Sequence, residues 1–198
     1  MSLLLDLLYP RDYFQGYYST VKVKSVHQFP EFDGVLSLFP YHFPISNMLH
    51  DLKYNFITDI IPDLINLSVS TINTNFPNIL KYWDDQKFCL IPVPLHLYRQ
   101  NWRGFNQSSL LALSLAKALN LSYRDDLVVR KHYTLPQAKI VNKTQRKTNL
   151  QHPFALNSAL IPSNLILFDD VITSGSTISS LASVLPKNCH LWALSIAG

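Results

Sequence analysis

The chain has 198 residues, of which 47% are hydrophobic, and this is enough to bury one substantial core, so one main domain is expected. A formal net charge of +4 is too small for a dedicated nucleic-acid binder, and two cysteines alone cannot build a zinc ribbon. Nowhere do about 18 apolar residues run together, so the sequence predicts a soluble, cytoplasmic protein without membrane insertion.

The first part of the chain is interpreted as an extension followed by the start of a folded domain. Residues 1–33 mix aromatic residues and prolines without periodicity and form the predicted N-terminal extension. The domain is expected over 34–198, with a strand at Val35–Phe39. The apolar spacing over 45–54 predicts a short helix, with Ser46 as its N-cap.

Helices and one strand are expected over the next part of the chain. The apolar spacing from residue 56 to about residue 80 predicts a second helix, with Pro62 in its first turn or at a kink. Residues 88–94 form an apolar run closed by prolines, which is typical of a buried strand leading into a loop. Leu111, Leu115, Ala118 and Leu119 repeat at helical spacing and predict the helix that follows.

The remaining elements continue this alternation. Two extended stretches are expected around 127–129 and 154–156, separated by a long basic connection. Residues 165–168 fit a buried strand, 169–176 a polar turn, 178–185 a helix and 191–196 a closing strand. Alternating strands and helices predict an α/β fold with a mostly parallel central sheet flanked by helices, in which ligands bind beyond the strands' carboxyl ends.

The strongest chemical signal is the stretch from residue 165 to residue 177. A buried strand delivers Asp169 and Asp170 to the sheet edge, where ionised carboxylates can accept hydrogen bonds from vicinal ribose hydroxyls. Hydroxyls and backbone amides then lead into a helix N-terminus that favours an anionic phosphate. Gly175 removes a Cβ where the chain bends around that phosphate. The predicted phosphate-binding residues are Thr173, Ser174, Gly175, Ser176 and Thr177.

A plain structural alternative exists for each half of this motif. The acids can cap a helix or face water, and Ser/Thr/Gly turns are common. Either half alone is a weak signal, whereas their combination favours a sugar phosphate. The rival phosphate patterns GxxxxGK[ST] and GxGxxG after a strand do not occur.

These residues resemble the signature with which type I phosphoribosyltransferases bind 5-phosphoribosyl-1-pyrophosphate (PRPP). Further blocks are similar to the branch of that family named for the bacterial competence protein ComF, and the similarity spans about residues 48–197. The blocks are Leu52–Tyr54, Ile91–Leu95, Arg103–Gln107, Pro136–Gln137, Gln145–Asn149 and Phe154.

The resemblance implies a type I phosphoribosyltransferase-like fold with a flexible hood. The implied activity is Mg²⁺-dependent transfer of a phosphoribosyl group with release of pyrophosphate to an unidentified acceptor. Asp169 and Asp170 are the implied catalytic residues, and Mg²⁺ would be held chiefly by PRPP, with these two acids as the candidate protein ligands. The alternative is a non-catalytic accessory protein of DNA uptake that binds PRPP or a nucleoside monophosphate and contacts single-stranded DNA or a helicase. The sequence leaves the oligomeric state open, a homo-oligomer included.

One departure from the family concerns zinc. Members often carry an N-terminal cysteine-rich zinc-binding segment, and Leu4–Pro10 is similar to the residues that lead into it. Here Arg11–Phe14 follows without a cysteine. No structural zinc is therefore expected.

Four further residues are implied at the pyrophosphate side of the site: Lys53, Arg103, Gly104 and Arg146. For Arg103 an equal alternative is that it only fastens the loop to the helix. Lys53 either reaches the pocket or is solvated like most helical lysines. Gly104 and Asn106 also fit a turn and an N-cap. The basic residues between 124 and 147, with Trp102, are the candidate DNA contacts, and the same basic run also fits a solvated face.

Overall fold

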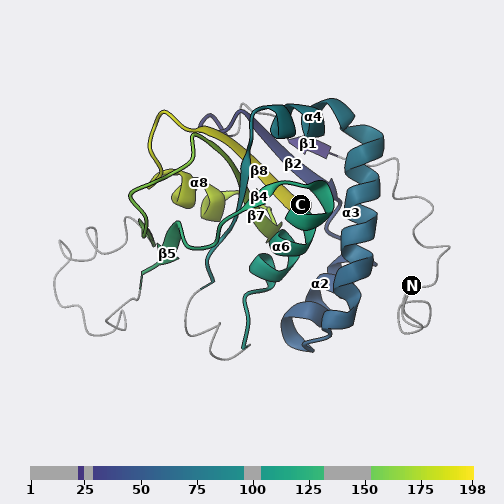
Figure 1. Ribbon diagram of the computed structural model, residues 1–198. Coiled ribbons are helices and arrows are strands. Elements are labelled where there is room, and N and C mark those ends of the chain that lie inside the picture. The colour runs from purple at the N-terminus through teal and green to yellow at the C-terminus, as the bar shows by residue number, and fades with distance from the viewer. Residues whose placement is uncertain (1–21, 25–28, 96–103, 132–152) are drawn as a thin grey trace, which may run out of the picture.

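A six-stranded sheet forms the centre of the computed structural model, which describes residues 22–24, 29–95, 104–131 and 153–198 (Figure 1). The strand order is β1-β2-β8-β7-β3-β4, and every neighbouring pair from β2 to β4 is parallel, whereas β1 pairs antiparallel with β2. The predicted mostly parallel sheet is thus confirmed. The strands are β1 (Lys22–Lys24), β2 (Gly34–Phe39), β3 (Cys89–Pro92), β4 (Ser122–Tyr123), β7 (Asn164–Val171) and β8 (His190–Ala197).

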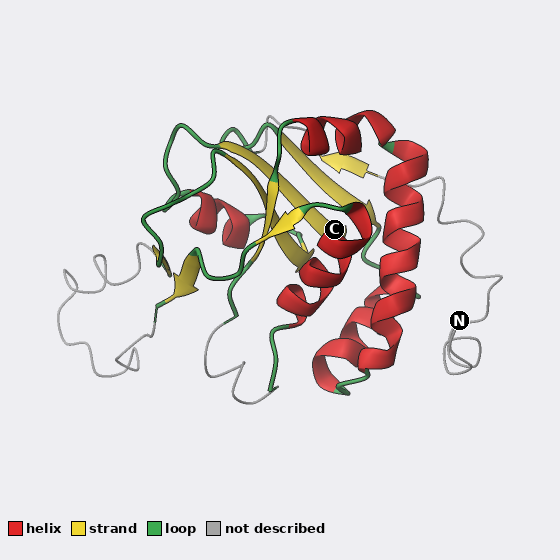
Figure 2. Ribbon diagram, viewed as in Figure 1, coloured by secondary structure: helices red, strands yellow, loops and turns green. Residues whose placement is uncertain are grey.

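Helices cover both faces of the sheet, as Figure 2 shows. One face packs against four α-helices through a large core that includes Leu36, Ile166 and Phe168. These helices, with the short 3₁₀ turn η4 (Thr58–Ile60), are α2 (Ile45–Tyr54), α3 (Ile61–Asn75), α4 (Pro77–Asp85) and α6 (Gln107–Leu119). No helix among the described residues combines the length and apolar character that crossing a membrane requires.

The opposite face carries α8 (Ser176–Ala182) and a small antiparallel pair of strands, β5 (Val128–Arg130) and β6 (Phe154–Leu156). These elements pack through a second core, to which β7 contributes Leu165 and Leu167. Both extended stretches predicted here are therefore confirmed as strands. The connection between them, residues 132–152, lies outside the described residues.

Strand β7 carries the two acids further into the sheet than expected. The prediction of a polar turn from residue 169 is wrong, because β7 continues to Val171 and pairs with β8 through Asp169 and Val171. Successive side chains of a strand point to opposite faces. The two carboxylates therefore leave the strand in different directions.

Two helix predictions also need correction. Ser46 is not an N-cap, because α2 begins at Ile45 after Pro44 and no side chain caps it. The helix predicted from 56 to 80 is interrupted at Phe76, and α4 begins with Pro77 in its first turn. A proline cannot donate the backbone hydrogen bond that would continue α3, so a new helix starts there. Pro62 lies in the first turn of α3, as predicted.

Part of the predicted N-terminal extension belongs to the sheet and core. Strand β1 comes from it, and Phe29 and Phe32 are buried in the second core, with exposures of 5% and 2%. The division of the chain at residue 33 stays a prediction. Cys89 and Cys189 are both free thiols.

Candidate functional site

A cavity of about 160 Å³ opens at the carboxyl ends of β3 and β7. We call it the acid pocket, because both acids of β7 line it. Its other lining residues come from α2, the start of α6, the loop after β3, β5 and the start of α8. The full set is Lys53, Tyr54, Val93, Pro94, Leu95, Gln107, Ser108, Arg130, Asp169, Asp170 and Thr177.

The two acids have different partners. Asp169 Oδ1 accepts hydrogen bonds from the Ser108 hydroxyl and from the backbone amide of Asp170, each at 3.0 Å. Asp170 is 4% exposed, and its Oδ2 forms an ion pair with Lys53 Nζ at 2.7 Å. Among the described residues, Asp169 Oδ2 and Asp170 Oδ1 have no hydrogen-bond partner. Each carboxylate thus keeps one oxygen that can accept a hydrogen bond from a ligand.

Lys53 reaches the pocket from the last turn of α2. Its side chain is 18% exposed, so most of it is removed from water while its ammonium contacts Asp170. Of the two interpretations of Lys53 from sequence, the geometry matches the one in which the side chain reaches the pocket.

The environment of Asp169 disfavours its charge. Burial, followed by the neighbouring charge of Asp170, raises the pKa of Asp169 to about 7, although the hydrogen bond from Ser108 acts in the opposite direction. Near neutral pH this carboxyl therefore exchanges a proton easily.

This raised pKa predicts how protein stability changes with pH. A carboxyl whose folded-state pKa is raised stabilises the fold below its unfolded value of about 4, and this contribution is lost as the pH rises towards 7. Asp169→Asn removes the titration. Between pH 5 and pH 8 the free energy of unfolding of the variant should therefore gain about 1 to 3 kcal/mol relative to wild type. Urea unfolding measures this difference, and a difference that does not change with pH would contradict the raised pKa.

The loop between β7 and α8 contains the predicted phosphate-binding residues. Gly175 has a φ of 76°, in the left-handed region, and α8 starts immediately after it. The Ser174 hydroxyl donates to Ser176 Oγ at 3.2 Å and accepts from the Ser176 amide at 3.4 Å. Thr173, Ser174 and Ser176 are exposed, and Thr177 alone of this set lines the acid pocket.

Gly175 is required by a close contact as well as by its backbone angle. A Cβ at this position would lie 2.0 Å from Phe29 Cε1. Gly175→Ala is therefore expected to lower the free energy of unfolding by about 1 to 3 kcal/mol, from left-handed strain and overpacking together. Thermal unfolding measures the loss. Gly104→Ala is the matched control, because Gly104 has the same φ of 76° and nothing within 4 Å of an added Cβ. An equal loss in both variants would show that the Phe29 contact contributes nothing.

The start of α6 is tied to the end of β3 by Asn106. Its side-chain oxygen accepts from the Ser108 amide at 3.1 Å, and its amide group donates to the carbonyl of Val93 at 3.1 Å. The N-cap prediction for Asn106 is confirmed. Gly104 lies in the preceding turn and does not line the acid pocket.

The pocket residues that were not predicted as site residues from the sequence include Gln107, Ser108 and Arg130. Gln107 and Ser108 follow Asn106 in the first turn of α6. Gln107 ends the Arg103–Gln107 block, so the similarity of that block to the family already pointed to this part of the chain. Arg130 belongs to the basic run, but its position at the end of β5, in the lining of the acid pocket, could not be inferred from the sequence. Its guanidinium carbon lies 5.3 Å from the centre of the Phe154 ring. Arg103, Arg146 and Trp102 lie outside the described residues.

The donor set in the pocket fits a hard cation better than a soft one. Asp169 and Asp170 supply carboxylate oxygens, and no group of three or more His, Cys, Asp or Glu side chains that could hold a metal occurs among the described residues. Such a pair suits Mg²⁺ that brings most of its ligands from water or from a bound phosphate.

Comparison with known proteins gives consistent relatives, whereas a scan against models of protein families finds no match. The chain is 29% identical over 170 residues to the "DNA utilization protein YhgH" of Shigella flexneri, covering 83% of this chain and 73% of that protein. It is 28% identical over 191 residues to "Competence protein F" of Haemophilus influenzae, covering 91% and 80%. With "Competence protein ComFC" of Bacillus subtilis it shares 30% identity over 123 residues, or 62% of this chain and 47% of that protein.

The mostly parallel sheet with helices on both faces defines an α/β protein of the phosphoribosyltransferase-like fold. These relatives, at 28% to 30% identity, support a ComF-type family.

Proposed function

We propose that the protein binds PRPP together with Mg²⁺ in the acid pocket and transfers the phosphoribosyl group to a nitrogen-containing acceptor. The observation that carries this proposal is the pair Asp169 and Asp170 at the end of β7, directly before a glycine-containing loop and a helix. A ligand with a diol at one end and a phosphate at the other satisfies both halves of this arrangement.

The free carboxylate oxygens support the ribose end of the proposal. Asp169 Oδ2 and Asp170 Oδ1 accept hydrogen bonds from the two ribose hydroxyls. The Ser108 hydroxyl and the Lys53 ammonium hold the other oxygens of these acids and so fix their orientation. In this interpretation Lys53 acts on Asp170 and orients the acid pair.

The loop after β7 supports the phosphate end. The backbone amides of Ser174 and Gly175 donate no hydrogen bond to any described residue. The absence of a Cβ at Gly175 leaves room for the Phe29 ring, which packs against this part of the loop. These amides, with the hydroxyl of Thr177, supply donors for the 5′-phosphate of PRPP.

The proposed reaction needs no covalent intermediate with the protein. The lone pair of the acceptor nitrogen forms a bond to C1 of the ribose while the bond from C1 to the pyrophosphate oxygen breaks. Its electron pair leaves with pyrophosphate, and the acceptor nitrogen loses its proton to solvent. Mg²⁺, when bound, neutralises charge that develops on pyrophosphate. The protein contributes the position of the ribose and a site that is partly removed from water.

Release of pyrophosphate tests the proposal. The full chain is incubated with PRPP, Mg²⁺ and a panel of acceptors that contains ammonia and nitrogenous bases. Release is expected with at least one acceptor, and Asp169→Asn/Asp170→Asn should abolish it. Asp126→Asn is a matched control, because this exposed acid lies outside the acid pocket. If PRPP binds but no acceptor yields pyrophosphate, the transferase assignment is wrong.

A second candidate function is a binding protein of DNA uptake, in which the same pocket holds PRPP or a nucleoside monophosphate. The names of the relatives, which refer to DNA utilization and competence, favour it. Of the basic run, Arg124 is paired with Asp126 at 2.7 Å and Arg130 stacks on Phe154. Single-stranded DNA bound through phosphates should dissociate steeply as salt is raised, and affinity that is insensitive to salt would exclude this mode.

A further inference from the structure

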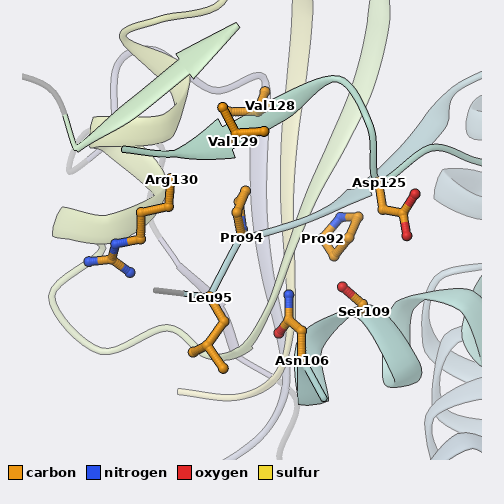
Figure 3. Close-up of a pocket in the computed structure, with 9 residues that line it drawn as sticks. All are labelled: Pro92, Pro94, Leu95, Asn106, Ser109, Asp125, Val128, Val129 and Arg130. Carbon is orange, nitrogen blue, oxygen red and sulfur yellow. The ribbon is translucent and has the colours of Figure 1, made fainter. Parts of the chain in front are cut away.

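A second cavity, of about 230 Å³, adjoins the acid pocket (Figure 3). We call it the hairpin cavity, because it is lined by all three residues of β5, which forms an antiparallel pair with β6. It shares Pro94, Leu95 and Arg130 with the acid pocket, so the two cavities have a common wall. The remaining lining residues are Pro92, Asn106, Ser109, Asp125, Val128 and Val129.

Prolines and valines form the apolar part of the lining of the hairpin cavity, and this part suits a flat occupant. Figure 3 shows Pro92 and Pro94 between Val128 and Val129 of β5 on one side and the first turn of α6 on the other. Proline rings and branched side chains offer a surface on which a planar ring can lie. The volume is below the roughly 300 Å³ of ordinary ligand pockets, so the occupant is small.

The two charged residues of this cavity stand at opposite ends in Figure 3. Arg130 lies at the end shared with the acid pocket, whereas Asp125 lies at the far end and does not line that pocket. An occupant therefore meets a carboxylate at the end that points away from the ribose site.

Asp125 already accepts one hydrogen bond within the protein. Its Oδ2 accepts from the Tyr123 hydroxyl at 3.2 Å. Burial, and secondarily the charge of Asp125, raises the pKa of Tyr123 to about 12, so this hydroxyl keeps its proton at neutral pH. Among the described residues Asp125 Oδ1 has no hydrogen-bond partner and Asp125 forms no salt bridge, whereas Asp126 is paired with Arg124 at 2.7 Å.

Ser109 adds a second polar group to the same cavity. No hydrogen bond of its hydroxyl occurs among the described residues, and this hydroxyl can accept as well as donate. Asn106, in contrast, has its oxygen and its amide nitrogen engaged with Ser108 and Val93. Asp125 Oδ1 and the Ser109 hydroxyl are thus acceptors of this cavity that have no partner among the described residues.

We propose that the hairpin cavity holds the acceptor and that this acceptor is a small planar heterocycle with an exocyclic amino group, such as an aminopurine or aminopyrimidine. Asp125 Oδ1 accepts from the amino group, while the ring lies between the prolines and the β5 valines. The ring then points its opposite edge towards the acid pocket. A ring that turns a carbonyl or carboxylate oxygen towards Asp125 places one acceptor against another and is disfavoured. This inference rests on the proposed phosphoribosyl site next to it.

Direct binding to the full chain tests the inference. Adenine, cytosine, hypoxanthine and orotate are titrated in ligand-observed NMR experiments with wild type, Asp125→Asn and Asp126→Asn. Adenine or cytosine should bind wild type at least about 10-fold more tightly than the two bases without an amino group. Asp125→Asn should remove this preference, and Asp126→Asn should keep it. Both substitutions affect exposed side chains and keep their shape, so the fold is expected to persist.

Titration of PRPP and Mg²⁺ into the same three proteins separates this inference from the proposed function. All three should bind PRPP equally, because Asp125 and Asp126 do not line the acid pocket. If PRPP binds and wild type binds hypoxanthine or orotate as tightly as adenine, the acceptor class is wrong. If PRPP binds but none of the four ring compounds binds, the inference about the hairpin cavity is also wrong. Failure of PRPP to bind wild type would instead remove the proposed function.

Discussion

Asp169→Asn/Asp170→Asn is expected to lower the affinity for PRPP and Mg²⁺ at least about 100-fold. Each carboxylate offers one free oxygen to a ribose hydroxyl. A hydrogen bond to a charged group contributes about 1.5 to 3 kcal/mol, so the loss of two corresponds to roughly 100-fold or more in affinity. Isothermal titration calorimetry with both proteins measures the difference.

The fold should survive this double change. Asparagine keeps the shape of both side chains, and Lys53, which loses its charged partner, is long enough to turn its ammonium towards water. Far-ultraviolet circular dichroism and the unfolding midpoint check this point. Affinity equal to that of wild type in a folded double variant would place the ligand elsewhere.

Lys53→Met is expected to cause the largest loss of stability among single substitutions in the site. Asp170 is 4% exposed, and without Lys53 its charge loses the ion pair that it forms among the described residues. Removal of one partner from a buried ion pair costs about 3 to 5 kcal/mol of unfolding free energy. Urea unfolding at neutral pH measures this loss.

Two further variants show whether the loss comes from the buried charge. Lys53→Met/Asp170→Asn removes both charges and should regain most of the lost free energy, because no unpaired ion remains. Lys81→Met breaks an exposed pair with Asp85, in which the two side chains are 76% and 56% exposed, and should cost less than about 1 kcal/mol. A loss in Lys53→Met no larger than in Lys81→Met would refute the buried pair.

Local patterns in the sequence predicted the elements that form the ligand edge of the sheet. The apolar runs of β3 and β7 are buried on both faces, as is typical of parallel strands. These strands could therefore be predicted from a continuous run of apolar residues, without an alternation of apolar and polar side chains. Gly175 was singled out as a backbone necessity, and its positive φ agrees. Asn106 carried a local capping signal, which acts over two residues and is therefore readable from sequence.

The contacts that complete the site depend on residues far apart in the chain. Lys53 meets Asp170, and Ser108 meets Asp169, only because the end of α2 and the start of α6 lie at the same edge of the sheet. No local pattern encodes those pairings. The contact of Phe29 with Gly175 likewise joins a segment without periodicity to the loop, so it could not be inferred.

The direction of the two acids was the main feature that the sequence could not give. A polar pair after an apolar run looks like the start of a turn, yet pairing with β8 keeps Asp169 and Asp170 inside β7. The strand pleat then sends them to different neighbours. Tertiary pairing, not local propensity, decided where the strand ended.

A crystal structure of the wild-type chain grown with PRPP and Mg²⁺ tests the central claim most directly. The ribose hydroxyls should lie within hydrogen-bond distance of Asp169 and Asp170, and the 5′-phosphate should contact the amides of Ser174 and Gly175. Density for PRPP at another place on the protein, with these carboxylates facing only water, would contradict the account.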